Sequence, residues 1–315
     1  MTPARPTVRL KPKIDPRRIR RGFPWVYANE LVVDRRTKSL TPGVVATLED
    51  AERKPVATVT VNPGSKIVCR VLDRDATADI DDDWIFARVA QAASLRNRAY
   101  ESPYFRLIHA EADGLPGVIV DLFGQVAAIQ PNSAWAEAHF DALAGAVRAV
   151  TSAATIVKNA SGRARGTEGL DDVSAVLGDA IDAPVPVPMN GATYMADLIG
   201  GQKTGLFYDQ RENHAFVSRL AQGSRVLDVF SHVGGFSLAA LAGGATSALA
   251  VDASAPALAL AQRGAEAMGM QDRFATRQGD AFDVLTTLGQ EGAEFDLVIC
   301  DPPAFAPARP ALDAG

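Results

Sequence analysis

The sequence has little cysteine: among its 315 residues only Cys69 and Cys300 are present, and they lie far apart. Without a Cys-X-X-Cys pair we expect neither a structural zinc site nor a disulfide framework, and no metal is predicted. The sequence also lacks any run of the roughly 18–20 apolar residues that a membrane helix needs. Its basic N-terminus has no apolar segment or small-residue cleavage site behind it, unlike a secretory signal. We therefore expect a cytoplasmic protein without a membrane partner.

Charge is unevenly distributed along the chain. The net charge is only −5, but residues 1–40 contain eleven Lys or Arg and three acidic residues, so this head carries +8 and the rest −13. An arginine-rich head on an acidic body can dock a polyanion, and aromatic side chains beside arginines can stack on unpaired bases. The alternatives are a solvated tail, or aromatic residues that anchor the head to its own core. The predicted RNA-binding residues are Arg17, Arg18, Arg20, Arg21, Phe23 and Trp25.

The pattern of apolar residues predicts three parts. Residues 1–75 show short apolar runs broken by turn residues, which is typical of a small β-barrel. Residues 76–189 mix helices and strands, and we interpret them as a central α+β module. Residues 190–315 alternate apolar strands with helices, which is typical of a Rossmann-like, doubly wound parallel sheet. The expected fold class is therefore α/β.

Two further segments precede that alternation. The proline-rich residues 184–188 predict a stiff connector, because proline fixes the backbone and removes a hydrogen-bond donor. Residues 192–197 and 204–207 then predict a hairpin that leads into a helix over 211–220. These segments would join the central module to the C-terminal sheet.

The first strand of the C-terminal part, over residues 226–230, runs into the glycine pair Gly234 and Gly235. Such a pair between a strand and a helix lets a ligand approach the backbone near the helix N-terminus. The spacing is not Gly-X-Gly-X-X-Gly, and Asp228 inside the strand end would oppose a pyrophosphate. These features point away from NAD and towards a ligand with an amino group and a sulfonium.

Acidic residues follow the next three strands. Asp252 ends the second strand, where a carboxylate can accept hydrogen bonds from both hydroxyls of a ribose. Asp280 follows the third strand and suits an adenine amino group, and Asp301 follows the fourth. Because ligands of open α/β sheets bind at the carboxyl ends of the strands, these acids together predict a nucleoside-bearing cofactor.

These residues resemble a known family. They are similar to class I S-adenosylmethionine-dependent methyltransferases, and more narrowly to the bacterial 23S ribosomal RNA cytosine-5 methyltransferases that carry an N-terminal PUA domain. The resemblance covers nearly the whole chain. The segments that carry it are the basic run 10–25, EADGLPG at 111–117, GQKTGLFYDQR at 201–211, DVFSHVGGFS at 228–237, Asp252, Asp280 and DPPAF at 301–305.

The resemblance implies a PUA barrel, a central module and a Rossmann-like catalytic domain that binds S-adenosylmethionine. It implies that Asp252 holds the ribose, that Asp280 holds the adenine, and that Asp228 with the glycine turn holds the methionine end. Residues 203–211 would lie over the cofactor pocket. The cofactor-binding residues that it implies are Asp228, Phe230, Gly234, Gly235, Phe236, Asp252, Asp280, Tyr208, Gln210 and Arg211.

Carbon 5 of cytosine is a weak nucleophile, so its methylation is expected to need a cysteine thiolate that adds to carbon 6. The catalytic residues that the resemblance implies are Asp301, Pro302, Pro303 and Phe305, with Asp301 in contact with the base. We expect Cys300 in the core, because its side chain should point opposite to that of Asp301, and Cys69 in the barrel core. The family's cysteine motif follows a later strand and is missing here, so we expect a truncated chain.

Three functional hypotheses remain open at this point. The first is an RNA methyltransferase that forms 5-methylcytosine in large-subunit ribosomal RNA. The second is an amino-group methyltransferase, because Asp-Pro-Pro followed by an aromatic residue also suits an exocyclic amine, although Phe305 falls one residue later than in the usual motif. The third is an RNA- and cofactor-binding protein without turnover, because the cysteine motif is missing. The sequence leaves a homodimer open.

Overall fold

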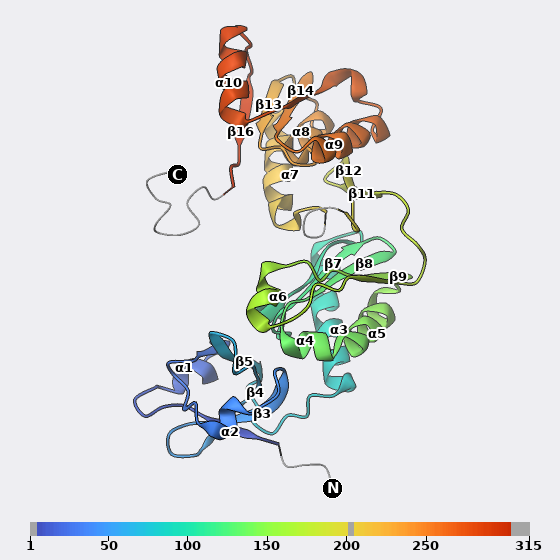
Figure 1. The fold of residues 1–315 in the computed structure, drawn as a ribbon. Coiled ribbons are helices and arrows are strands. Elements are labelled where there is room, and N and C mark those ends of the chain that lie inside the picture. Colours follow the sequence, from blue (N-terminus) through green and yellow to red (C-terminus); the bar gives the residue numbers. More distant parts are fainter. Residues whose placement is uncertain (1–4, 201–204, 304–315) are drawn as a thin grey trace. The chain divides into compact units, whose positions relative to one another are not determined.

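A computed structural model of the protein describes residues 5–200 and 205–303 (Figure 1). The chain divides into two compact units, Met1–Ala180 and Ile181–Gly315. Within the described ranges, no helix is long and apolar enough to cross a membrane. Phe305, predicted to be catalytic, and residues 201–204 of the predicted pocket segment lie outside these ranges.

The N-terminal unit begins with a five-stranded sheet, drawn in blue in Figure 1. Its strand order is β1-β3-β4-β5-β2, in which only the β1–β3 pair is parallel. Val26, Leu48, Val59 and Cys69 are fully buried in its core, which confirms the predicted barrel and the predicted place of Cys69. Its elements are β1 (Thr7–Arg9), α1 (Arg17–Arg20), β2 (Trp25–Tyr27), α2 (Arg35–Lys38), β3 (Val44–Glu49), β4 (Pro55–Val61) and β5 (Ile67–Asp73).

The same unit continues with a second five-stranded sheet, of order β10-β9-β8-β7-β6, whose core surrounds the buried Trp135. The long helix α3 begins where the side chain of Asp81 accepts a hydrogen bond from the Trp84 amide. The helical segment after β8 is divided into two helices, α4 and α5, because His139 leaves the helical backbone conformation. The elements are α3 (Asp82–Ala99), β6 (Tyr104–His109), η1 (Ala110–Asp113), β7 (Val118–Phe123), β8 (Val126–Pro131), α4 (Ala134–Ala138), α5 (Phe140–Thr151), β9 (Thr155–Lys158), α6 (Arg163–Glu168) and β10 (Ala175–Leu177).

The C-terminal unit contains the predicted parallel sheet. The strand order is β15-β14-β13-β16, and every pair is parallel, which confirms the Rossmann-like alternation. A separate hairpin of β11 and β12 precedes it, and β12 packs against α8 and α9. The elements are β11 (Val185–Met189), β12 (Ala192–Ala196), η2 (Tyr208–Gln210), α7 (Arg211–Leu220), β13 (Arg225–Val229), α8 (Gly235–Ala242), β14 (Ser247–Asp252), α9 (Ala255–Ala267), η3 (Gln271–Arg273), β15 (Phe274–Gln278), α10 (Ala281–Gln290) and β16 (Leu297–Cys300).

The prediction of a connector over residues 184–188 is wrong, because most of this stretch is the strand β11. Its prolines occupy alternate positions, Pro186 and Pro188, which are exposed, whereas Val187 and Met189 are buried. Alternate N–H groups of a strand point to the same side, so the prolines remove donors only from the side that faces away from β12. β11 is an edge strand, where proline is tolerated.

The predicted partner of the 192–197 strand is also wrong. Residues 205–207 form no strand, and β12 pairs instead with the preceding β11. The two strands are joined by Asn190 and Gly191, both with positive φ, 55° and 76°. Two positive φ values are the geometry of a type I′ turn, which matches the twist of a two-stranded hairpin. The Asn-Gly pair was therefore the stronger hairpin signal in the sequence.

Candidate functional site

A cavity of about 860 Å³ lies at the carboxyl ends of β13, β14 and β16 in the C-terminal unit. The residues that line it come from the segment between β12 and α7, α7 itself, the turn after β13, the end of β14, the start of α9, the start of α10 and the segment after β16. Its volume falls within the range of about 300–1,000 Å³ that is usual for cofactor and ligand sites. The parallel sheet therefore brings its predicted ligand edge to one enclosed space.

The turn after β13 has an unusual backbone. Phe230, His232 and Gly234 have φ values of 65°, 50° and 77°, so left-handed residues alternate with right-handed or extended ones over five positions. Left-handed backbone at a residue other than glycine is costly and is found mostly at functional sites. The turn also packs tightly, because a Cβ on Gly235 would lie 2.6 Å from Nε2 of His214. This turn lets the start of α8 approach the cavity closely.

Asp228 lies under that turn and is 1% exposed. Its Oδ2 atom accepts hydrogen bonds from the amide and the hydroxyl of Ser237, both at 2.9 Å, so it ties α8 to β13. Its Oδ1 atom has no hydrogen-bond partner among the described residues. Burial raises the pKa of this carboxyl from 3.8 to about 7. Asp228 does not line the cavity, so its side chain acts on the turn rather than at the cavity wall.

Asp252, at the end of β14, lines the cavity. Its Oδ2 atom accepts a hydrogen bond from the His232 amide at 2.8 Å, and its Oδ1 atom accepts one from the Ser254 amide at 2.8 Å. A carboxylate oxygen can accept more than one hydrogen bond, so each oxygen can also receive a hydroxyl. The backbone thus orients Asp252 for a diol.

Asp280 is the N-cap of α10 and also lines the cavity. Its Oδ1 atom accepts hydrogen bonds from the amides of Phe282 and Asp283, at 2.9 and 3.3 Å. This cap explains why the sequence places an acid here, since capping alone stabilises a helix start. The same carboxylate is exposed and borders the space that Asp252 faces.

Asp301 follows β16 and lines the cavity together with Pro302 and Pro303. Its Oδ2 atom accepts a hydrogen bond at 3.0 Å from the side-chain amide of Gln210, which also lines the cavity. The prediction that Cys300 lies in the core is wrong, because Cys300 is exposed. β16 is the last strand of the described sheet, so its side chains pack on fewer neighbours than those of a central strand. Cys300 does not line the cavity.

His214 was not singled out by the sequence, yet it lines the cavity and is 4% exposed. Its ring stacks on Tyr194, with ring centroids 5.7 Å apart, and meets Phe236 edge-on at 4.7 Å. Burial lowers its pKa to about 4, so the ring is neutral at pH 7. No motif marks this histidine, because its role depends on how the amphipathic helix α7 packs. Tyr208, in η2 just before α7, is also buried.

The predicted RNA-binding residues lie in the N-terminal unit and fall into two groups. Arg17, Arg21 and Phe23 are exposed, and Arg20 reaches only to 3.9 Å from the Asp50 carboxylate. Arg18 instead pairs with Glu30 and lies over the Phe23 ring, 4.7 Å from its centroid. Phe23 thus offers an aromatic surface beside cationic side chains, which is the arrangement that suits stacking on bases.

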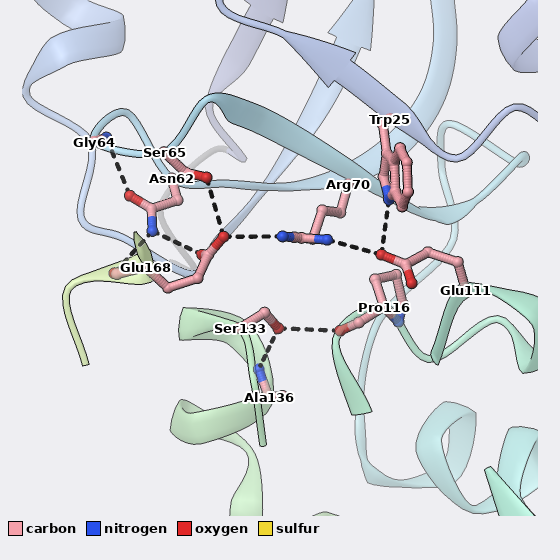
Figure 2. A network of polar contacts seen from close by, with 10 residues as sticks. All are labelled: Trp25, Asn62, Gly64, Ser65, Arg70, Glu111, Pro116, Ser133, Ala136 and Glu168. Atoms are coloured by element: carbon pink, nitrogen blue, oxygen red, sulfur yellow. Dashed lines mark hydrogen bonds and ion pairs between the residues drawn. The ribbon is translucent and has the colours of Figure 1, made fainter. Parts of the chain in front are cut away.

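Trp25 is engaged in a network of polar contacts (Figure 2). Its Nε1 atom donates a hydrogen bond to Glu111 at 2.8 Å, and Glu111 also binds Arg70 at 2.8 Å. Arg70 in turn reaches Glu168 at 3.0 Å. Figure 2 shows the side chain of Arg70 between those of Glu111 and Glu168. The first acid of the EADGLPG segment therefore has a structural role, and so does the indole of Trp25.

Comparisons with known proteins agree with this geometry. The PUA-like domain family matches residues 8–74, and the S-adenosylmethionine-dependent methyltransferase family matches residues 164–312. The chain is 34% identical to ribosomal RNA large subunit methyltransferase I of Pseudoalteromonas translucida over 91% of its own length and 74% of that protein. The chain belongs to the S-adenosylmethionine-dependent methyltransferases. The methyltransferase is also 34% identical to the protein of the same name from Vibrio cholerae, over 99% of its length and 79% of the relative.

Solved structures show the fold of the methyltransferase. A protein described as a SAM-dependent methyltransferase from Streptococcus mutans superposes with a TM-score of 0.79 at 21% identity, over 95% of this chain and 77% of that one. A protein called SMU.776, solved in complex with SAH, gives 0.79 at 22% identity, over 96% and 77%. S-adenosylmethionine is the cofactor of the methyltransferase. The cavity fits this group, because the turn through Gly235 and the carboxylate of Asp252, which backbone amides orient, border it together.

Proposed function

We propose that this methyltransferase forms 5-methylcytosine in large-subunit ribosomal RNA. The observation that carries the proposal is the cavity in which Asp252 and the segment Asp301-Pro302-Pro303 border the same space. A diol-binding carboxylate and a base-facing carboxylate are then within one site. The relatives named ribosomal RNA large subunit methyltransferase I support the class of RNA, and the PUA-like domain supports RNA as the partner.

Different residues along the cavity would contact different parts of the cofactor. Asp252 would accept the ribose hydroxyls, because both its oxygens are oriented by backbone amides. Asp280 would accept the adenine amino group, and the turn through Gly234 and Gly235 would receive the methionine end against the start of α8. Asp228 would hold that turn in place through Ser237. When bound, S-adenosylmethionine supplies an electrophilic methyl group.

The substrate side of the cavity is formed by the segment after β16. The carboxylate of Asp301 would accept a hydrogen bond from the amino group of the base, and Pro302 with Pro303 would give it a rigid wall. A base in folded RNA would have to leave its stack to reach this wall. The exposed Arg17, Arg21 and Phe23 would hold the surrounding RNA.

A second candidate is methylation of an amino group. Methylation of carbon 5 requires a thiolate, and neither cysteine borders the cavity. Burial in the barrel raises the pKa of the Cys69 thiol well above its usual range, and Cys300 faces solvent outside the cavity lining. An exocyclic amine needs no thiolate and could bind Asp301 directly. The Asp-Pro-Pro segment at the cavity therefore supports the second candidate as well, and the named relatives support ribosomal RNA as the substrate of either candidate.

Nucleoside analysis decides between the two. The purified protein is incubated with isotope-labelled S-adenosylmethionine and unmodified 23S ribosomal RNA, and the digested nucleosides are separated by mass spectrometry. We expect labelled 5-methylcytidine, and we expect Asp252→Asn to abolish the label through loss of cofactor affinity. Labelled N-methyl nucleosides would replace the first candidate by the second. Binding of RNA and cofactor without any labelled product would overturn both.

A further inference from the structure

The carboxylate of Asp301 contacts one amide side chain, which in turn contacts a second amide. The Nε2 atom of Gln210, in η2, donates a hydrogen bond to Oδ2 of Asp301 at 3.0 Å. The Nδ2 atom of Asn213, one turn further along in α7, donates to Oε1 of the same Gln210 at 2.6 Å. The contact joins residues that are 91 positions apart in the sequence. It therefore links the start of α7 to the end of β16 at the rim of the cavity.

The order of these bonds fixes the direction of the amide. A glutamine side chain has a donating and an accepting end, and rotation by 180° about its last bond exchanges them. Because Asn213 donates to the oxygen of Gln210, the NH₂ group is left to face Asp301. With the opposite orientation, an amide oxygen would face a carboxylate and two acceptors would repel each other. Asn213 thus determines what Gln210 presents.

Asp301 needs this hydrogen bond because its position in the fold does little to restrict its side chain. It is exposed and follows an edge strand of the described sheet, so few packed neighbours restrict its rotamers. A hydrogen bond to one carboxylate oxygen selects one orientation of the group and directs the other oxygen. Both Gln210 and Asp301 line the cavity, so the orientation is set where a substrate would arrive.

We infer that Gln210, oriented by Asn213, is a positioning residue that aims the Asp301 carboxylate at the substrate and so selects a base that carries an amino group. This inference rests on the proposed function in one respect, since it takes Asp301 as the group that contacts the base. Cytosine presents an amino donor to a carboxylate, whereas uracil presents a carbonyl oxygen at the same place. A carboxylate oxygen held in place accepts a hydrogen bond from the cytosine amino group and repels the uracil carbonyl oxygen. Polar sites discriminate isosteric ligands in this way.

A purely structural bond would have different consequences. If the Gln210–Asp301 contact only tethered η2 to the end of β16, its loss would weaken all ligands of the cavity alike. If it positions Asp301, its loss weakens the cytosine-containing ligand more than the uracil-containing ligand. The ratio of two affinities therefore separates the two roles, and it does so without turnover.

The experiment measures binding of short oligocytidine and oligouridine to the S-adenosylhomocysteine complex by fluorescence anisotropy. The wild-type protein should prefer oligocytidine by about tenfold, the value of one well-formed hydrogen bond to a charged group. Gln210→Ala should reduce the preference to about twofold or less, and Gln210→Glu should lower oligocytidine binding further through repulsion of Asp301. Asn213→Ala should lie between, and adding it to Gln210→Ala should have no further effect because it acts through Gln210.

A matched control is available on α9, where Gln262 donates to the carboxylate of Glu266 outside the cavity lining. Gln262→Ala should leave both the preference and cofactor affinity unchanged. Equal weakening of both oligonucleotides in Gln210→Ala, or no preference in the wild type, would overturn the inference. A wild-type protein that shows the preference but forms no labelled nucleoside would instead contradict the proposed function alone.

Discussion

Two buried carboxylates, one in each unit, have opposite surroundings. Glu168 in the N-terminal unit accepts hydrogen bonds at both oxygens, from Ser65 and Arg70 at Oε1 and from Asn62 at Oε2 (Figure 2). Among the described residues, Asp228 in the C-terminal unit accepts hydrogen bonds at one oxygen only, and both come from Ser237. A fully paired buried charge joins elements of a fold, whereas a half-paired one adds strain that the surrounding structure must offset.

The contrast extends to neighbouring groups. Around the turn after β13, the hydroxyls of Tyr194 and Ser231 and the Nδ1 atom of His214 are buried without a hydrogen-bond partner among the described residues. In the N-terminal unit the corresponding atoms are nitrogens, and three of the four belong to arginines that each form an ion pair through another nitrogen. These atoms are Nε of Arg9, Arg18 and Arg70, and Nε1 of Trp135. Buried polar atoms without a partner among the described residues thus gather around the turn after β13 in the C-terminal unit.

The largest expected effect on the free energy of unfolding comes from the ion pairs of Arg70 with Glu111 and Glu168. Arg70→Ala removes the partner of both Glu168 and Glu111, and leaves Glu168 buried with less compensation. Loss of one partner from a buried ion pair typically costs about 3–5 kcal/mol of unfolding free energy. The loss of unfolding free energy is measured by urea unfolding of the variant and the wild-type protein. The matched control is Arg277→Ala, which breaks an exposed pair with Glu291 and should cost less than about 1 kcal/mol. Equal losses in the two variants would contradict the distinction.

The half-paired carboxylate of Asp228 should make the free energy of unfolding depend on pH. The pKa of Asp228 is about 7 in the folded protein and 3.8 without its surroundings, so the folded state binds this proton more tightly. The contribution of this group to stability is therefore present below about pH 4 and is lost as the pH rises to about 7. The loss is at most about 4 kcal/mol, at about 1.4 kcal/mol for each pKa unit.

Asp228→Asn should remove this dependence. The measurement is the free energy of unfolding of the two proteins at pH 5 and pH 8. The wild-type protein should lose more stability than the variant between these values, because the amide does not ionise. A variant with the same pH dependence as the wild type would show that the other oxygen of Asp228 has a partner in solution.

The smallest expected effect tests the packing of the turn. In Gly235→Ala the new methyl group would lie 2.6 Å from Nε2 of His214, which is held between Tyr194 and Phe236 and cannot move freely. Overpacking of this kind costs about 1–3 kcal/mol. Titration calorimetry with S-adenosylhomocysteine should show weaker binding as well. In the control Gly289→Ala nothing lies within 4 Å, so a gain of about 0.4–1 kcal/mol is expected. A loss of unfolding free energy in Gly289→Ala, or no loss in Gly235→Ala, would contradict the tight packing of the turn against His214.

Much of the C-terminal sheet could be predicted from the sequence because its signals are local. Apolar strands alternate with helices, and Asp252 and Asp280 follow strand ends as the topology requires. The position of Cys300 could not be predicted, because strand alternation gives the direction of a side chain but not what covers it. His214 could not be predicted either. Its place beside the cavity arises from the packing of α7 on α8, which no short motif encodes.

The two prolines of β11 have a consequence for how the protein behaves in a crowded solution. An edge strand with free N–H groups offers a template on which a strand of another molecule can pair. At Pro186 and Pro188 the side of β11 that faces away from β12 has no N–H to donate, so an incoming strand would find unmatched carbonyl groups. The same prolines that gave this strand the sequence of a connector therefore protect the β11 edge of the hairpin from pairing with a strand of another molecule.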